Sequence, residues 1–174
     1  MKLTQAAAAT FGLNDDSWKR HANAWSVWSR MAGLAPILLP IYFRDVFGWW
    51  ALVPIAAGVV WMWINPHAFK PVHEPRSWAE KGIYGEKMYA ADRSLAAEAH
   101  RPAIRWLIAM AAVGAAIMVY GLVRVEAWPA VFGWALVFIS QLWQIDRFVA
   151  IYEEGLRRVV AEGEGASART RENI

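Results

Sequence analysis

The sequence predicts an all-α membrane protein, a four-transmembrane-helix bundle with both termini in the cytoplasm. Three observations predict it: long apolar stretches, a one-sided distribution of basic residues and a high content of tryptophan. Of the 174 residues, 57 % are hydrophobic and 12 are tryptophan. Tryptophan favours the membrane–water interface. A soluble helical bundle is the alternative, but such long apolar runs are improbable in it.

The apolar stretches set the number of spans. A membrane-spanning helix needs about 20 mostly apolar residues to cross a hydrocarbon core about 30 Å thick. The charge-free stretches are 31–43, 46–66, 106–123 and 127–145. The first is too short unless its helix begins near Trp25, which places Arg30 at the inner edge of the bilayer. We therefore expect one membrane domain at 14–163, tails at 1–13 and 164–174, and spans at about 24–44, 46–66, 103–123 and 127–147.

The basic residues set the orientation. Of the 18 Lys and Arg residues, only Arg44 and Arg124 lie in the two short turns on one side of the predicted bundle. Positive residues favour the cytoplasmic side of a membrane. We therefore expect a multi-pass protein of the inner (cytoplasmic) membrane, N-in and C-in, whose first partner is the lipid bilayer. Nucleic-acid binding would explain the net charge of +3 but not its placement, so no nucleic-acid partner is expected.

The N-terminal half is expected to form a long first helix, an outer turn and a second helix. Residues 14–17 offer N-cap chemistry for a helix that runs to Arg44. Pro36 and Pro40 should kink that helix. A tight turn at 45–48 leads into the second helix, which is expected to end at Pro66.

Short surface helices are expected on the cytoplasmic face between the second and third spans. Ser77 and Glu80 have the spacing of a capping box for the first of them. Gly82 and Gly85 are expected to interrupt it, and 86–100 reads as a second surface helix.

The last two helices complete the predicted bundle. Pro102 fits the first turn of the third span. The fourth helix is expected to continue past the bilayer to about Ala161.

Polar residues of three helices fall at a similar depth near the inner edge. Counted from the outer turns at 1.5 Å per residue, Arg30 lies about 21 Å deep, Asn65 about 24 Å and Asp146 about 27 Å. We therefore predict an Arg30–Asp146 contact, direct or through one water. The predicted polar cluster comprises Asn23, Ser26, Arg30, Asn65, Glu86, Trp143, Gln144, Asp146 and Arg147. Ionisable groups within spans often mark function, but interhelical polar contacts also commonly hold membrane bundles together.

Four motifs carry a resemblance to a known family. They are H-x-N-x-W-S-x-W-[ST]-R from His21, W-x-N-P from Trp63, W-x3-G-x2-G-E from Trp78 and W-x2-D-R from Trp143. Together they resemble an uncharacterised family of small multi-pass bacterial and archaeal membrane proteins, over residues 21 to about 152. Ala24 departs from the proline expected after the asparagine. The resemblance implies topology and motif positions only, because that family has no assigned activity.

No catalytic or cofactor motif stands out. The chain has no cysteine, and its four histidines lie outside the charge-free spans, which disfavours a haem held between spans. A metal site formed by His21, His67 or His100 with Glu86 is conceivable, but scattered surface histidines are far commoner. We therefore expect no metal and no cofactor. No carboxylate lies at the bilayer midplane, which disfavours a proton-coupled transporter.

Two classes of function follow from these observations. The first is a non-enzymatic accessory or assembly subunit of a membrane complex, which implies a membrane-protein partner or a homo-oligomer. The second is a small-molecule or lipid-headgroup site, binding or enzymatic, at the cytoplasmic membrane edge. The sequence favours the first class and assigns no catalytic residue.

Overall fold

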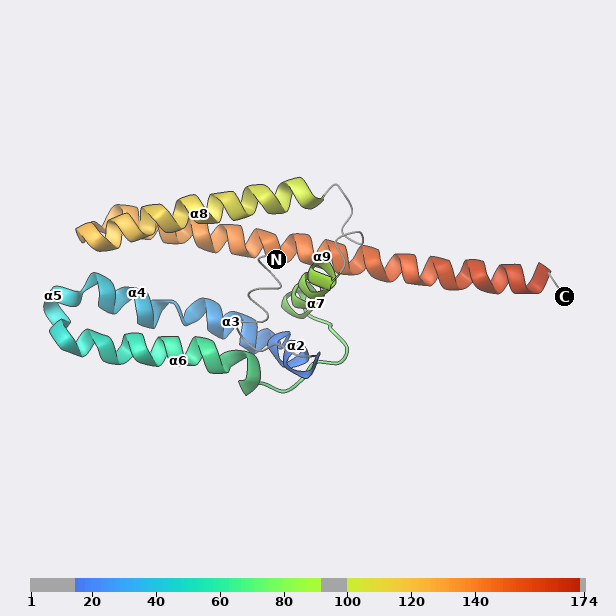
Figure 1. The fold of residues 1–174 in the computed structure, drawn as a ribbon, viewed down its shortest axis with the longest axis horizontal. Helices are drawn as coiled ribbons and strands as arrows, with labels where there is room; N and C mark the ends of the chain where they lie inside the picture. The colour runs from blue at the N-terminus through green and yellow to red at the C-terminus, as the bar shows by residue number, and fades with distance from the viewer. Residues whose placement is uncertain (1–14, 92–99, 173–174) are drawn as a thin grey trace.

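The computed structural model describes residues 15–91 and 100–172, and within these ranges the protein is all-helical. Figure 1 shows two long antiparallel pairs of helices that lie side by side, with short helices at one end. The helices are α2 (Asp15–His21), α3 (Ala24–Ala32), α4 (Ala35–Tyr42), α5 (Arg44–Phe47), η1 (Gly48–Ala51), α6 (Leu52–Ala68), α7 (Trp78–Ala91), α8 (His100–Arg124) and α9 (Ala127–Glu172).

Three helical segments are long and apolar enough to cross a membrane. They are Arg44–Ala68, His100–Arg124 and Ala127–Ala161. They match the second, third and fourth predicted spans. Pro102 lies in the first turn of α8, as predicted, where a missing N–H costs no helical hydrogen bond. The structure therefore confirms an all-helical fold with at least three potential spans.

The first predicted span consists of two shorter helices rather than one. Asn23 caps α3, since its Oδ1 accepts a hydrogen bond from the Trp25 N–H at 3.0 Å. The helix stops at Gly33, and α4 restarts with Pro36 in its first turn. The expected single helix from 14–17 to Arg44 was therefore wrong, because Asn23 and Pro36 each favour a new helix start. In Figure 1, α3 and α4 follow each other along the length of α6.

The helix α7 runs without interruption through both of its glycines, so the predicted break at Gly82 and Gly85 was wrong. The capping box is confirmed: Glu80 Oε2 accepts from the Ser77 N–H at 2.9 Å, and the Glu80 N–H donates to Ser77 Oγ at 3.3 Å. Both glycines are buried against α9, where an added Cβ on Gly85 would overlap the Phe148 carbonyl. They are sites of close helix approach, which outweighs the modest helix propensity of glycine. The expected second surface helix over 86–100 falls partly on 92–99, outside the described residues.

The helices α6 and α9 both extend beyond their expected ends. Pro66 lies inside the last turn of α6, which continues to Ala68. The helix α9 continues to Glu172, well past Ala161. A formed helix gains one hydrogen bond for each residue it adds, and each glycine costs only about 1 kcal/mol relative to alanine. The helix α9 therefore tolerates the two glycines that follow Ala161, Gly163 and Gly165.

Each pair of long helices is closely packed within itself. A Cβ added to Gly133 of α9 would overlap the Met118 backbone of α8, and one on Gly114 would lie 2.8 Å from Leu136 Cβ. A Cβ on Gly58 of α6 would lie 2.6 Å from Ile37 Cγ1 of α4. Small residues let membrane helices approach closely. We call the α3–α4/α6 pair the first hairpin and the α8/α9 pair the second hairpin.

An arginine joins the two hairpins at the end where the outer turns lie. The Arg44 guanidinium donates to the carbonyls of Leu122 at 2.6 Å and Val123 at 2.9 Å, in the last turn of α8. Tyr42 Oη donates to the Val125 carbonyl at 3.4 Å. These carbonyls have no partner inside their helix, so a cation there is favourable. We call this group of contacts the outer clamp.

Candidate functional site

The predicted polar cluster lies at the end opposite the outer clamp, and the structure divides it into three sets of contacts. The first set joins α3 to α6. Ser26 Oγ donates to Asn65 Oδ1 at 2.7 Å, and Asn65 Nδ2 donates to Ser29 Oγ at 2.8 Å. Asn65 is completely buried. Asn23 Nδ2 also donates to the Lys70 carbonyl at 3.2 Å. The asparagine of the W-x-N-P motif is thus a buried link within the first hairpin.

The second set joins α2, α3 and α7. The Arg30 guanidinium donates to the His21 ring, with 3.1 Å between Arg30 Nη1 and His21 Nε2. Burial, together with the charges of Arg30 and His67, lowers the pKa of His21 to about 3, so the ring is a neutral acceptor. Burial raises the pKa of Glu86, and the neighbouring positive charge of Arg30 opposes that rise. The arginine therefore sits between a neutral histidine and a carboxyl group.

The third set joins α7 to α9. Trp78 Nε1 donates to Asp146 Oδ1 at 3.5 Å, and Arg147 Nη2 donates to Asp146 Oδ2 at 2.7 Å. Gly82 packs against Ile145 and Gly85 against Phe148. The W-x3-G-x2-G-E motif is therefore the surface of α7 that seats on the W-x2-D-R segment of α9. Its glutamate reaches the second set of contacts.

Of the predicted Arg30–Asp146 contact, direct or through one water, the direct form is not made, and the form through one water stays a prediction. Arg30 is engaged by His21 and Glu86, and Asp146 by Trp78 and Arg147. Counting residues along helices gives depth but not lateral position. Trp78 of α7 bridges the two helices that carry the predicted partners: its ring stacks on Trp28 of α3, with centroids 6.2 Å apart, while its N–H reaches Asp146 of α9.

The remaining predicted cluster residues on α9 stand apart from these contacts. Trp143 is exposed and Gln144 is half-buried. Ser140 is buried, but its hydroxyl donates to the Leu136 carbonyl of its own helix at 2.6 Å. A serine that bonds back to its own helix has no free donor for a neighbouring helix.

The part of the chain that the structure describes holds no group of three His, Asp or Glu side chains placed to bind a metal. His100, one of the histidines considered for such a site, instead lies 3.0 Å from Glu154 of α9. His21 is engaged by Arg30.

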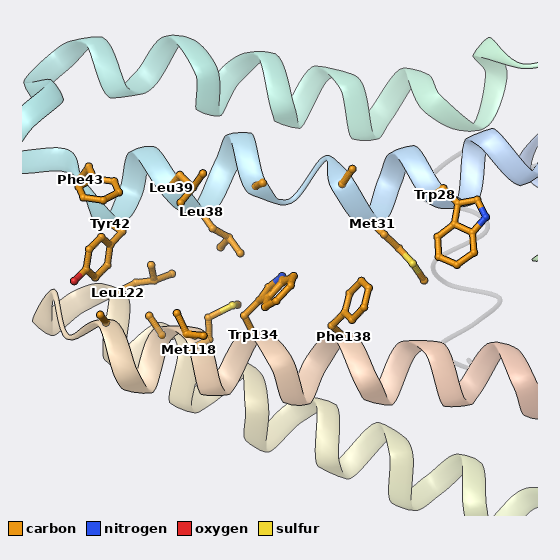
Figure 2. Close-up of a pocket in the computed structure, with 15 residues that line it drawn as sticks. Trp28, Met31, Leu38, Leu39, Tyr42, Phe43, Met118, Leu122, Trp134 and Phe138 are labelled. Atoms are coloured by element: carbon orange, nitrogen blue, oxygen red, sulfur yellow. The ribbon is translucent and has the colours of Figure 1, made fainter.

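A cavity of about 640 Å³ lies between the two hairpins, between the polar contacts and the outer clamp. Figure 2 shows Met31 of α3 and Leu38 of α4 on the side of Phe138 and Trp134 of α9, and Tyr42 pointing toward Leu122 of α8. Among the residues that the structure describes, no charged side chain lines the cavity. Arg30, Glu86 and Asp146 are all absent from its wall. Trp28 lines the cavity at the end nearest the polar contacts and stacks on Trp78, so one tryptophan pair separates the two environments.

Sequence reasoning missed three features of this region. Arg44 was read only as one of two outer basic residues, although it closes the outer clamp. Lys81 forms an ion pair with Glu153 at 3.0 Å that links α7 to α9. The cavity itself has no sequence signal, because it depends on how far apart the hairpins lie.

Comparison with known proteins gives a family and no assigned activity. The match is to the Family of unknown function (DUF6653) and covers residues 2–173. Neither the curated proteins nor the solved structures compared with the chain gave a match. Because the family match extends over almost the whole sequence, the chain belongs to the Family of unknown function DUF6653.

Proposed function

We propose that the protein is a four-span inner-membrane protein, N-in and C-in, that acts as a non-enzymatic accessory or assembly subunit. Its first span is α3 followed by α4. These two helices extend along α6 in Figure 1, so together they match a helix that is long enough to cross. Irregular backbone between them is tolerated in a membrane where neighbouring helices cover it.

Exposed tryptophans support this placement in the bilayer. Trp49 is 88 % exposed and Trp128 is 77 % exposed, and both lie at the end with the outer turns. Trp106 is 76 % exposed and lies near the start of α8, at the other end. Two such belts are expected where a protein meets both membrane interfaces.

The observation that carries the non-enzymatic assignment is the mutual engagement of the polar residues. Asn65 is buried between Ser26 and Ser29, and Arg30 lies against His21. None of these polar groups faces the cavity between the hairpins. Side chains arranged this way hold helices in register, which is the usual role of polar residues inside membrane bundles.

One observation favours the second class, a headgroup or small-molecule site at the cytoplasmic edge. Asp146 is 49 % exposed and Arg147 is 34 % exposed at their side chains. The Arg147 Nε is buried and has no hydrogen-bond partner among the described residues. This pair is the one part of the polar cluster that is both charged and open to the surroundings.

A labelling experiment tests the placement in the membrane. Because the chain contains no cysteine, each introduced cysteine is its only reactive thiol. Asp45→Cys and His73→Cys, both at exposed positions, are treated with a membrane-impermeant maleimide in cells with a permeable outer envelope and in inverted inner-membrane vesicles. We expect Asp45→Cys to react in the cells and His73→Cys to react in the vesicles. The four-span topology requires an odd number of crossings between the two cysteines. Reaction of both cysteines from the same side would therefore contradict that topology.

Native mass spectrometry tests the subunit assignment. The tagged protein is extracted from its own membrane in mild detergent and measured intact. We expect a reproducible larger assembly that contains this chain. A lone protomer that turns over a co-purified small molecule would overturn the assignment in favour of the second class.

A further inference from the structure

We propose that the cavity between the hairpins binds the acyl chain of an anionic phospholipid from the cytoplasmic leaflet, with its phosphate at Arg147. The inference rests on the proposed membrane placement, with the Trp28 end of the cavity toward the cytoplasm. It goes beyond that placement by assigning a ligand class to a cavity that the accessory role does not require.

The size of the cavity selects a hydrocarbon chain over a protein helix. A helix about 10 Å wide that crosses a core about 30 Å thick occupies roughly 2,400 Å³. The cavity holds about 640 Å³. Carbon atoms in contact lie about 4 Å apart, so a chain that reaches through one leaflet, about 15 Å, occupies on the order of 250 Å³. One or two acyl chains therefore fit, and a partner's transmembrane helix does not.

The length of the cavity suits a lipid of one leaflet. Its wall runs from Trp28 to Phe43 along α3 and α4, as Figure 2 shows. At 1.5 Å per residue this wall is about 22 Å long, somewhat more than one leaflet. Apolar cavities of this kind do not hold ordered water. In a bilayer, lipid hydrocarbon is the adjacent medium that matches such a wall.

The arginines at the two ends of the cavity differ in whether a donor is left without a partner, and this difference orients the lipid. At one end, Trp28 stacks on Trp78 at 6.2 Å, Trp78 Nε1 reaches Asp146 at 3.5 Å, and Arg147 lies against the same carboxylate. Arg147 Nε is a donor without a partner. At the other end, the Arg44 guanidinium is already occupied by three backbone carbonyls.

Asp146 occupies one amino group of the Arg147 guanidinium and the side chain is 34 % exposed, so its remaining N–H groups can donate to a lipid phosphate. The tryptophan pair lies at the depth where indole rings meet the headgroup layer. The headgroup is therefore assigned to the Trp28 end, and the chain extends from there toward Tyr42 and the outer clamp.

Photolabelling of the full-length protein in bilayers tests this assignment. The probe is phosphatidylglycerol with a diazirine at the end of one acyl chain, in a background of phosphatidylcholine. We expect labelled residues deep in the cavity, at Leu38, Tyr42 or Met118, in addition to the general labelling of lipid-facing residues such as Val59. Labelling of lipid-facing residues alone would overturn the proposal.

Two matched alanines control for nonspecific labelling. Ala35 lines the cavity, whereas Ala57 is exposed on α6 and is absent from the cavity wall. Ala35→Phe should lower labelling of the cavity residues at least fivefold and leave labelling of α6 unchanged, and Ala57→Phe should leave both unchanged. If Ala35→Phe does not fold, Ala32→Phe fills the same wall one turn earlier. Equal cavity labelling in the filled and control variants would contradict the proposal.

A separate measurement tests the headgroup position. Native mass spectrometry in mixed phosphatidylglycerol and phosphatidylcholine should show preferential retention of the anionic lipid, and Arg147→Gln should reduce that preference about fivefold. A photoreactive headgroup should label near Trp78, and labelling near Tyr42 instead would overturn the cytoplasmic assignment. If no lipid binding is observed while the maleimide labelling pattern is as expected, this inference is contradicted and the proposed membrane topology is not.

Discussion

The interior of each hairpin and the space between the two hairpins are held by different interactions. Within the second hairpin, Gly114 and Gly133 bring α8 and α9 into backbone contact. Between the hairpins lies an apolar cavity of about 640 Å³, with the outer clamp beyond one end and the polar contacts beyond the other. Shape complementarity therefore builds each hairpin, and a small number of polar groups at the two ends joins them. This division predicts that single substitutions at the ends separate the hairpins while each hairpin survives.

The largest effect is expected where α7 seats on α9. Gly85→Ala places a methyl group onto the Phe148 carbonyl, and backbone cannot move aside as a flexible side chain can. We expect a loss of about 3 kcal/mol in the free energy of unfolding, at the upper end for overpacking. Thermal unfolding in mild detergent measures it.

Gly155→Ala is the matched control for this change. Its added methyl group would meet only the end of the Met88 side chain, which can rotate. Similar losses for the two variants would show that α7 does not depend on close backbone contact.

The next effect is expected at the buried asparagine within the first hairpin. Asn65→Ala removes both hydrogen bonds to Ser26 and Ser29 and leaves the buried Ser26 hydroxyl without its acceptor. We expect a loss of about 2–3 kcal/mol. Ile64→Ala, next along the chain at a half-exposed position, should cost less than 1 kcal/mol. Equal losses at the two positions, measured by thermal unfolding, would contradict the role of Asn65 as a link.

The comparison also predicts that stability depends on pH at the end that carries the polar contacts. His21 is neutral in the folded protein, with its pKa lowered to about 3, whereas an unfolded histidine titrates near 6.5. The unfolded state therefore binds the extra proton between these values, and stability falls as the pH falls through this window. The raised pKa of Glu86 has the opposite effect: it makes stability fall as the pH rises above the ordinary pKa of a glutamate.

Comparison of His21→Gln with the native chain isolates the histidine contribution. From pH 7 to pH 5 the native chain should lose about 2 kcal/mol relative to the variant, because each pH unit below 6.5 corresponds to about 1.4 kcal/mol. His73→Gln, at an exposed position, should follow the native chain. Parallel stability curves for His21→Gln and the native chain would show that the His21 ring is not held neutral by burial.

The outer clamp should show a smaller effect. Arg44→Gln removes the donors to the Leu122 and Val123 carbonyls and should cost about 1–2 kcal/mol. Arg124→Gln is the control, since Arg124 is an exposed arginine whose nearest acidic partner, Glu126, lies 3.7 Å away; its replacement should cost less than about 0.5 kcal/mol. If both outer arginines behaved alike, the clamp would contribute nothing beyond surface charge.

Much of the arrangement along the helix axes could be predicted from the sequence. Apolar length predicted four spans, three of which are helices long enough to cross a membrane, and counting at 1.5 Å per residue placed Asn65, Arg30 and Asp146 toward the same end of the helices. The capping box at Ser77 and Glu80 was also readable, because it depends on local spacing alone.

The lateral arrangement could not be predicted, because residue counting carries no information on which helix lies beside which. No direct Arg30–Asp146 pair is formed, since Arg30 lies against His21 and Trp78 of α7 bridges α3 and α9, while a contact through one water stays a prediction. Gly82 and Gly85 were read as breaks for the same reason: a glycine that permits a turn and one that permits close packing look identical in sequence. The cavity depends on the distance between hairpins, which the contacts at both ends determine.

The smallest predicted effect is at the end of the hairpins that carries the outer clamp. Here the substitution removes backbone strain and is expected to raise stability, whereas the changes above remove contacts. Val125, just after α8, has φ of 57°, a left-handed conformation that costs a residue with a Cβ about 1–2 kcal/mol. The fold keeps it because the Glu126 N–H then donates to the Gly121 carbonyl at 2.8 Å and ends the helix. Val125→Gly retains that bond and removes the strain, while glycine's freedom in the unfolded chain offsets part of the gain. We expect a net gain of about 0.5–1 kcal/mol in thermal unfolding. Val123→Gly, inside α8, should instead lose about 1 kcal/mol. A loss in both variants would mean that the Val125 side chain stabilises the outer end more than its backbone strains it.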